Sequence, residues 1–90
     1  MSKKLQNIAY DDPSLIFTTY DLHCSAALIC VGFLLLGLKK TNSKKALFVF
    51  KKGDGIEKTA DLYWSDLLKV KARTYADTIK MLKNRLYSKN

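Results

Sequence analysis

Ninety residues predict one domain with a modest core. A hydrophobic content of 48%, with ten aromatic residues, excludes a chain that is disordered throughout. The net charge of +8, from sixteen Lys and Arg against eight Asp and Glu, favours a polyanionic partner such as nucleic acid, anionic lipid or an acidic protein surface, without choosing among them.

The chain is predicted to be ordered in its middle and loose at its ends. Residues 1–14 contain a turn-forming cluster, Asp11-Asp12-Pro13-Ser14, and we expect a flexible N-terminal segment there. A single α+β domain is predicted over residues 15–87, followed by a disordered tail over 88–90. Polar residues occupy the place where a secretion signal carries its apolar core, which predicts a cytoplasmic protein.

The first predicted elements are a short strand at residues 15–17 and a helix of about three turns. Thr18 or Thr19 is the predicted N-cap of this helix, and with Thr18 as the cap Asp21 is the acidic member of a capping box. Cys24 and Cys30 fall in the helix, where their Cα atoms would be about 9 Å apart. A disulfide needs about 4.4 to 6.8 Å, so both cysteines are predicted to be free, as suits a reducing compartment.

This helix opens the most apolar part of the chain, residues 22–38, which hold no charged side chain. A membrane-spanning helix needs about 20 apolar residues, so the run is close to spanning length. Gly32 and Gly37 interrupt it, however, and Gly32 suits the left-handed backbone that ends a helix. We therefore predict that the run is divided between a helix and a strand, and that a membrane is an unlikely partner. A single-span membrane protein with a cytoplasmic basic part is the alternative.

Two apolar runs of strand length, 33–38 and 46–50, are separated by lysines around Thr41-Asn42-Ser43, and they predict a β-hairpin. Gly53-Asp54-Gly55 predicts a turn, because it lacks the further glycines and the Lys-Ser/Thr of a phosphate-binding loop. Ile56, Ala60, Tyr63 and Trp64 then recur at helical spacing and predict a second helix.

Residues 68–73 alternate between apolar and basic, which predicts a short, half-buried strand. The final helix is marked by one apolar stripe, at Tyr75, Ile79, Leu82 and Leu86. The predicted fold is therefore α+β, a small antiparallel sheet with a central hairpin packed by two or three helices. The element order also fits a ferredoxin-like split βαβ arrangement with an added helix.

Short motifs are spread over about four fifths of the chain: a Thr-x-Asp-Leu helix start, an Ala and a Gly-Phe closing that helix, a Phe-x-Phe strand, and a final helix with an aromatic residue, an Ile and Leu-Lys. They are Thr19, Asp21, Leu22, Ala26, Gly32, Phe33, Phe48, Phe50, Tyr75, Ile79, Leu82 and Lys83. In these motifs the chain resembles a family of small bacterial and phage-borne domains of unknown function. The resemblance implies a soluble domain, often carried by mobile elements, without an established activity.

Catalysis is not predicted, because no spaced set of catalytic groups is present. The single histidine, His23, has no matching partner, and we expect it at a helix surface or hydrogen-bonded within the fold. Together with Cys24 and Cys30 it lacks the ligand spacing of a closed zinc site. We expect no enzyme, no metal site and no cofactor.

The basic residues carry the functional prediction. Residues 39–52 contain six lysines and no acid, and further cations lie on the predicted strand 68–73 and the last helix. We predict a small basic accessory domain that binds nucleic acid or a nucleoprotein through sequence-tolerant contacts to phosphates. The predicted contact residues are Lys39, Lys40, Lys44, Lys45, Lys69, Lys71, Arg73, Lys80, Lys83 and Arg85.

Other interpretations of the same residues remain open. Lysines beside apolar strands also act as gatekeepers and blunt the edges of sheets. Tyr20, Tyr63 and Trp64 are candidates for stacking on bases, although the last two also fit a core. The excess of apolar residues for so small a core favours a protein–protein interaction module or an inhibitor of the phage or mobile-element type. Its partner would be a second copy of the chain or an acidic protein surface.

Overall fold

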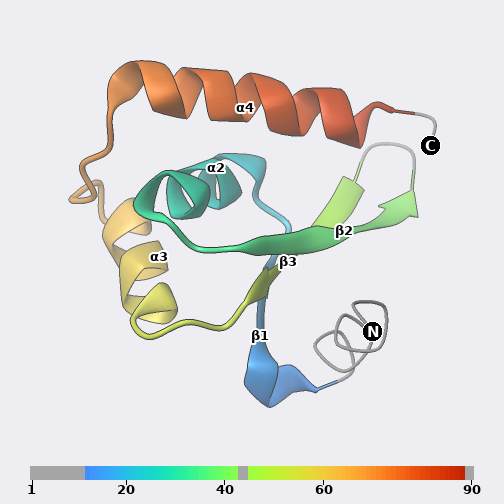
Figure 1. Ribbon diagram of the computed structural model, residues 1–90, viewed down its shortest axis with the longest axis horizontal. Helices are drawn as coiled ribbons and strands as arrows, with labels where there is room; N and C mark the ends of the chain where they lie inside the picture. Colours follow the sequence, from blue (N-terminus) through green and yellow to red (C-terminus); the bar gives the residue numbers. More distant parts are fainter. Residues whose placement is uncertain (1–11, 43–44, 89–90) are drawn as a thin grey trace.

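The computed structural model describes residues 12–42 and 45–88 (Figure 1). Over these residues it shows an α+β fold, in which three α-helices pack with a three-stranded antiparallel sheet, and this confirms the predicted class. In chain order the elements are η1 (Pro13–Leu15), β1 (Ile16–Thr19), α2 (Leu22–Val31), β2 (Leu35–Asn42), β3 (Lys45–Lys51), α3 (Ile56–Trp64) and α4 (Ala72–Leu86).

Some predictions fall outside the described residues: most of the flexible N-terminal segment, the hairpin turn at Ser43 and Lys44, and most of the C-terminal tail. The described part of the N-terminal turn cluster forms η1, a short 3-10 helix. Its start is fixed by the carboxylate of Asp12, which accepts a hydrogen bond from the backbone N–H of Ser14 at 2.9 Å.

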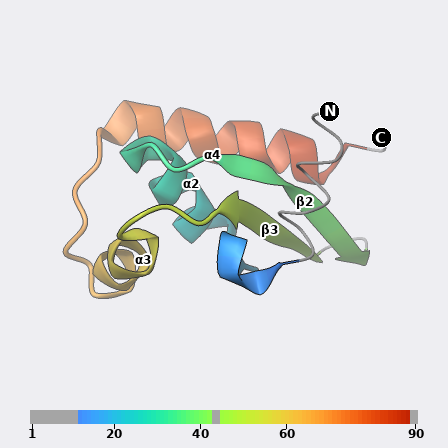
Figure 2. The ribbon, with the colours of Figure 1, turned by 60° about the horizontal axis from the view of Figure 1, so that its bottom comes forward.

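The sheet has the strand order β1-β3-β2, so β3 is the central strand (Figure 2). Phe50 of β3 pairs with Phe17 of β1 on one side and with Leu35 of β2 on the other. Because strand side chains alternate between the two faces, Phe48 and Phe50 share a face, and there both are buried in the core with residues of α2 and α4. The predicted hairpin is confirmed, although β2 begins two residues later than expected.

Gly32 divides the long apolar run, as predicted. α2 ends at Val31, and Gly32 adopts a φ of 120°, a backbone conformation that favours glycine. The backbone N–H groups of Gly32 and Phe33 both donate to the carbonyl of Leu28, at 3.2 and 3.0 Å, and so close the helix. Within residues 12–42 and 45–88, no helix is long and apolar enough to cross a membrane.

The prediction that Thr18 or Thr19 caps this helix is wrong. Thr18 lies in β1, and the N-cap of α2 is Asp21, whose carboxylate accepts a hydrogen bond from the backbone N–H of Cys24 at 2.6 Å. β1 continues to Thr19 because its residues pair with β3. This long-range pairing moves the start of the helix further along the chain.

α2 lacks charged side chains because it lies inside the fold. Five consecutive residues, from Cys24 to Leu28, are buried, so the helix is covered on several sides rather than along one stripe. Its neighbours are α4, α3 and β1. Figure 1 shows α2 between α4 and the sheet, where a helix that is apolar all round is expected.

The predicted strand over residues 68–73 is not formed. Leu68 and Val70 are half-buried near Tyr63 of α3, whereas Lys69 and Lys71 are exposed, so the alternation itself is real. In the described part of the chain, however, no strand pairs with this segment, and α4 begins already at Ala72. The fourth strand of a ferredoxin-like arrangement is therefore missing from these residues.

α3 and α4 cover the predicted ranges. α3 follows the expected turn, in which Gly55 has a φ of 81° and forms the N-cap. The apolar stripe of α4 is half-buried at Tyr75 and Ile79 and buried at Leu82 and Leu86. Trp64 differs from the prediction of a core residue, because 61% of its surface is exposed at the end of α3.

Candidate functional site

The predicted phosphate-binding residues lie at the surface. All of those that the structure describes are exposed, which leaves their charges accessible to a ligand; they are Lys39, Lys40, Lys45, Lys69, Lys71, Arg73, Lys80, Lys83 and Arg85. Lys44 lies outside the described residues. The structure does not gather these cations into one site: some lie along α4 and at its two ends, whereas Lys39 and Lys45 lie on the hairpin strands.

The first group is the hairpin-end cluster, which we define as Lys40 and Arg85. Lys40 of β2 and Arg85 of α4 line a common open cavity of about 380 Å³, although 45 positions separate them in the sequence. The ammonium group of Lys40 donates a hydrogen bond to the backbone carbonyl of Ser88, which ties the hairpin to the C-terminal end of α4. Figure 1 shows these two elements side by side, with the hairpin next to the end of the helix.

Lys45, the first residue of β3, lies at the same end of the sheet but outside this cluster. Its strand neighbour Ala46 pairs with Lys40, and because side chains alternate along a strand, Lys40 and Lys45 lie on opposite faces of the sheet. The Lys45 ammonium lies 4.7 Å from the centre of the Tyr20 ring, and Tyr20 is 52% exposed. Of the three aromatic candidates, Tyr20 is therefore the one that contacts a predicted phosphate-binding residue through its ring.

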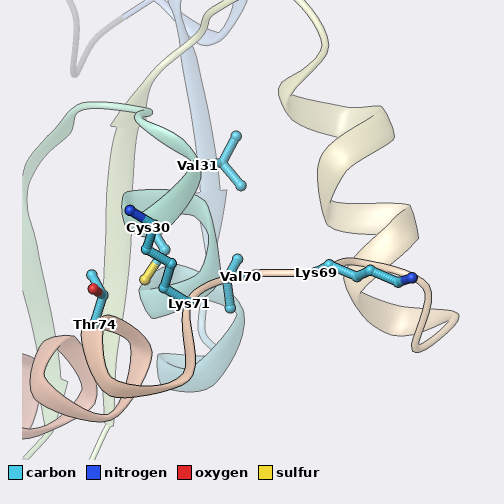
Figure 3. Close-up of a pocket in the computed structure, with 6 residues that line it drawn as sticks. All are labelled: Cys30, Val31, Lys69, Val70, Lys71 and Thr74. Atoms are coloured by element: carbon cyan, nitrogen blue, oxygen red, sulfur yellow. The ribbon is translucent and has the colours of Figure 1, made fainter.

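The second group is the linker cluster, which we define as Lys69, Lys71 and Arg73. Lys69 and Lys71 line an open cavity of about 620 Å³ together with Cys30 at the end of α2 and Thr74 in the first turn of α4. Figure 3 shows the Lys71 side chain beside Cys30, whereas the Lys69 side chain extends away from them. The prediction that these cations share one face of a strand is wrong, because Lys69 and Lys71 lie in a segment without strand structure and Arg73 lies in α4.

The linker cluster also lies at the positive end of a helix. Lys71 is the N-cap of α4, and its side chain makes no capping hydrogen bond. Backbone N–H groups in the first turn of a helix carry a partial positive charge and favour an anion. Cations and helix end therefore act in the same direction here, so this end of α4 attracts negative charge.

The two clusters lie at opposite ends of α4. Fourteen residues separate Lys71 from Arg85, which corresponds to about 21 Å along a helix. Lys80 and Lys83 occupy the exposed surface between them. The arrangement can contact a ligand with several negative charges spaced along its length, rather than a single small anion.

Acidic residues lie elsewhere on the molecule. Four of the eight acids fall between residues 54 and 66, around α3, and they are Asp54, Glu57, Asp61 and Asp66. Among the described residues, the ion pair that the structure shows joins Lys52 to Glu57 at 3.6 Å, and it involves none of the predicted contact residues. The charge is therefore polarised, with the hairpin and α4 basic and the α3 region acidic.

His23 and Cys24 are neighbours in α2, one exposed and the other buried. Burial, assisted by the charge of Asp21, raises the pKa of the Cys24 thiol to about 11, which keeps it neutral and weakly nucleophilic near pH 7. His23 is exposed at the surface of α2. In residues 12–42 and 45–88, no three His, Cys, Asp or Glu side chains come close enough to hold a metal ion.

The remaining aromatic candidates have structural contacts. Burial, with Tyr75 as the next cause, raises the pKa of Tyr63 to about 12. The hydroxyl of Tyr75 donates to the backbone carbonyl of His23 at 3.3 Å, which joins α4 to α2. The ring of Trp64 contacts the edge of the Tyr63 ring, with the two centroids 5.0 Å apart. Tyr63 thus belongs to the packing between helices, and Trp64 lies on the acidic side of the molecule.

Comparison with known proteins identifies a family but no activity. Neither the curated proteins nor the solved structures contain a match. A family model described as a domain of unknown function, DUF5659, matches residues 15–88, a range that includes the three α-helices and the three strands of the described residues. The chain therefore belongs to the DUF5659 family of domains of unknown function.

Proposed function

We infer that this protein is a non-enzymatic domain that binds nucleic acid through its two basic clusters and the exposed surface of α4 between them. The observation that carries the proposal is the placement of Lys40 and Arg85 on one cavity, because the fold brings together two cations that are distant in the sequence. Like charges repel, so a fold that keeps them adjacent and exposed favours a polyanionic ligand.

The distribution of acids supports the same proposal. A basic surface that merely keeps a protein in solution has its cations interspersed with carboxylates, as around α3. Residues 69–85 instead carry six basic side chains and one acid, Asp77.

The proposal includes a cytoplasmic location, which the two free cysteines, Cys24 and Cys30, support because thiols stay reduced there.

Fluorescence anisotropy with a labelled oligonucleotide tests this function. If about four phosphates are contacted, affinity should fall about 100-fold between roughly 50 and 200 mM salt. Replacing both Lys40 and Arg85 by Ala should weaken binding and reduce the slope of log affinity against log salt by about two. The matched control is Lys52→Ala with Lys58→Ala, which removes the same charge near α3. Absence of binding at micromolar protein in low salt, or an equal loss in the control, would contradict the proposal.

Self-association is a second candidate function, favoured by exposed apolar side chains at the end of α3. Trp64 is 61% exposed, and Leu67, three residues further on, is 67% exposed. Apolar side chains gathered on a surface often mark a protein interface. Sedimentation equilibrium over a range of concentrations tests this: the native chain should form dimers that the Trp64→Ala, Leu67→Ala variant does not form. A native chain that stays monomeric excludes it.

A further inference from the structure

We propose that α4 is a recognition helix that enters the major groove of double-stranded DNA, an inference that rests on the nucleic-acid binding proposed above. It goes further by naming the form of nucleic acid, the element that contacts the bases and the residues that select the sequence.

The outer ridge of α4 carries side chains suited to base edges. Arg73, Asp77, Lys80 and Asn84 follow spacings of four, three and four residues, so they lie above one another on one face of the helix. All four are exposed, and this face is opposite the buried stripe that includes Leu82. In the major groove Arg and Lys recognise guanine, Asn recognises adenine, and Asp accepts a hydrogen bond from cytosine.

The shape of the molecule leaves this ridge free to dock. Figures 1 and 2 show α4 along one long side of the fold, with α2 and the hairpin on its inner side. A helix with its side chains is about 10 to 12 Å wide, and the major groove of B-DNA is about 12 Å wide. The major groove of duplex RNA is too narrow for side chains to reach the bases, so the fit favours DNA.

The basic clusters are placed to hold such a helix in the groove. The linker cluster lies at the N-terminal end of α4, and the hairpin-end cluster lies at its C-terminal end. A helix in the groove has a sugar–phosphate wall beyond each end, and contacts to these walls fix the register while the ridge between them contacts bases. Lys71 and Arg85, about 21 Å apart, can then contact opposite walls.

The side chains of α4 favour a duplex over a single strand. Proteins that bind single strands without sequence preference stack bases on aromatic rings. Within Ala72–Leu86 the one aromatic residue, Tyr75, belongs to the half-buried stripe, so the ridge carries no aromatic side chain. The exposed Tyr87 lies just beyond the helix at its C-cap, and the exposed Tyr20 lies beyond the end of β1. Trp64, the exposed tryptophan, lies on α3 among acids that repel phosphates.

Selection from a pool of random DNA duplexes, followed by anisotropy measurements, tests the inference. A selected duplex should bind about tenfold tighter than a scrambled duplex, and also tighter than either of its separate strands. Asn84→Ala should abolish the preference for one base pair, so that affinity for the selected duplex falls toward that for the scrambled duplex. Lys83→Ala, which lies to the side of the ridge, is the matched control: it should weaken both duplexes equally and lower the salt slope by about one.

Two outcomes overturn the inference while the proposed function stands: single strands that bind as tightly as the duplex, or tight binding without any sequence enrichment. A preference that survives Asn84→Ala, Lys80→Ala and Arg73→Ala also overturns it, because base contacts would then come from elsewhere. Circular dichroism of each variant establishes that it is folded. Failure to bind any oligonucleotide in low salt is the distinct result that rejects the proposed function itself.

Discussion

At the level of a single residue, Asp21 links the end of β1 to the start of α2. Its side chain caps α2 through Cys24, and its backbone N–H donates to the hydroxyl of Thr19 at the end of β1. Its backbone carbonyl accepts from the hydroxyl of Ser25 at 2.8 Å. The residue therefore fixes the direction in which the chain leaves the sheet and enters its central helix.

We predict that Asp21→Ala lowers the free energy of unfolding by about 1 kcal/mol, because the N–H of Cys24 loses its partner. Urea unfolding followed by circular dichroism measures this. Asp21→Asn keeps a capping oxygen and should lose less than half as much. Thr18→Ala is the second comparison, since sequence patterning makes Thr18 the cap: a larger loss there than at Asp21 contradicts the assignment.

At the level of elements, the sequence predicted those structures that depend on local periodicity. The stripe through Tyr75 and Leu82 marks α4 because one helix face is covered and the other is not. The alternation at Leu68 and Val70 was misleading, because it shows only that alternate side chains are covered. It does not show that a neighbouring strand pairs with this segment. Whether a strand pairs with the segment between α3 and α4 is decided by where that segment lies in the fold, and it lies among the helices.

The basic surface, too, could be predicted from the sequence only where it depends on local spacing. The spacing of Arg73, Lys80 and Asn84 is visible in the sequence, and with attention to polar as well as charged residues it could have marked the outer ridge. The placement of Lys40 and Arg85 on one cavity could not be predicted, because it depends on how far the hairpin extends along α4. Such a placement is set by packing across the core rather than by local pattern.

Gly32 provides an element-scale test of how the apolar run is divided. An added Cβ there meets no atom within 4 Å, so Gly32→Ala strains only the backbone, whose φ of 120° is unfavourable for alanine. We predict a loss of about 1 to 2 kcal/mol in the free energy of unfolding, measured in urea. If residues 22–38 instead formed one continuous helix, the same change would stabilise it by up to about 1 kcal/mol. A gain in stability therefore contradicts the division at Gly32.

At the scale of the whole molecule, the distribution of charge follows the arrangement of the elements. α2 holds the sheet, α3 and α4 together without contributing charge, so the surface elements are free to specialise. α3 carries acids, whereas the hairpin and α4 carry cations on the other side. A molecule polarised in this way turns its basic side toward a polyanion as it approaches, which raises the rate of productive encounters.

This polarity leads to a prediction about the two ends of α4. If one nucleic acid spans both basic clusters, Lys40→Ala and Lys71→Ala should each weaken binding about fivefold to tenfold at roughly 0.1 M salt, because each removes one phosphate contact. The two residues lie too far apart to interact directly, so the double variant should weaken binding by the product, about 50-fold. Anisotropy titrations of the four proteins measure this, with Lys52→Ala as a control of equal charge. If either single variant binds like the native chain, only one end of α4 contacts the ligand.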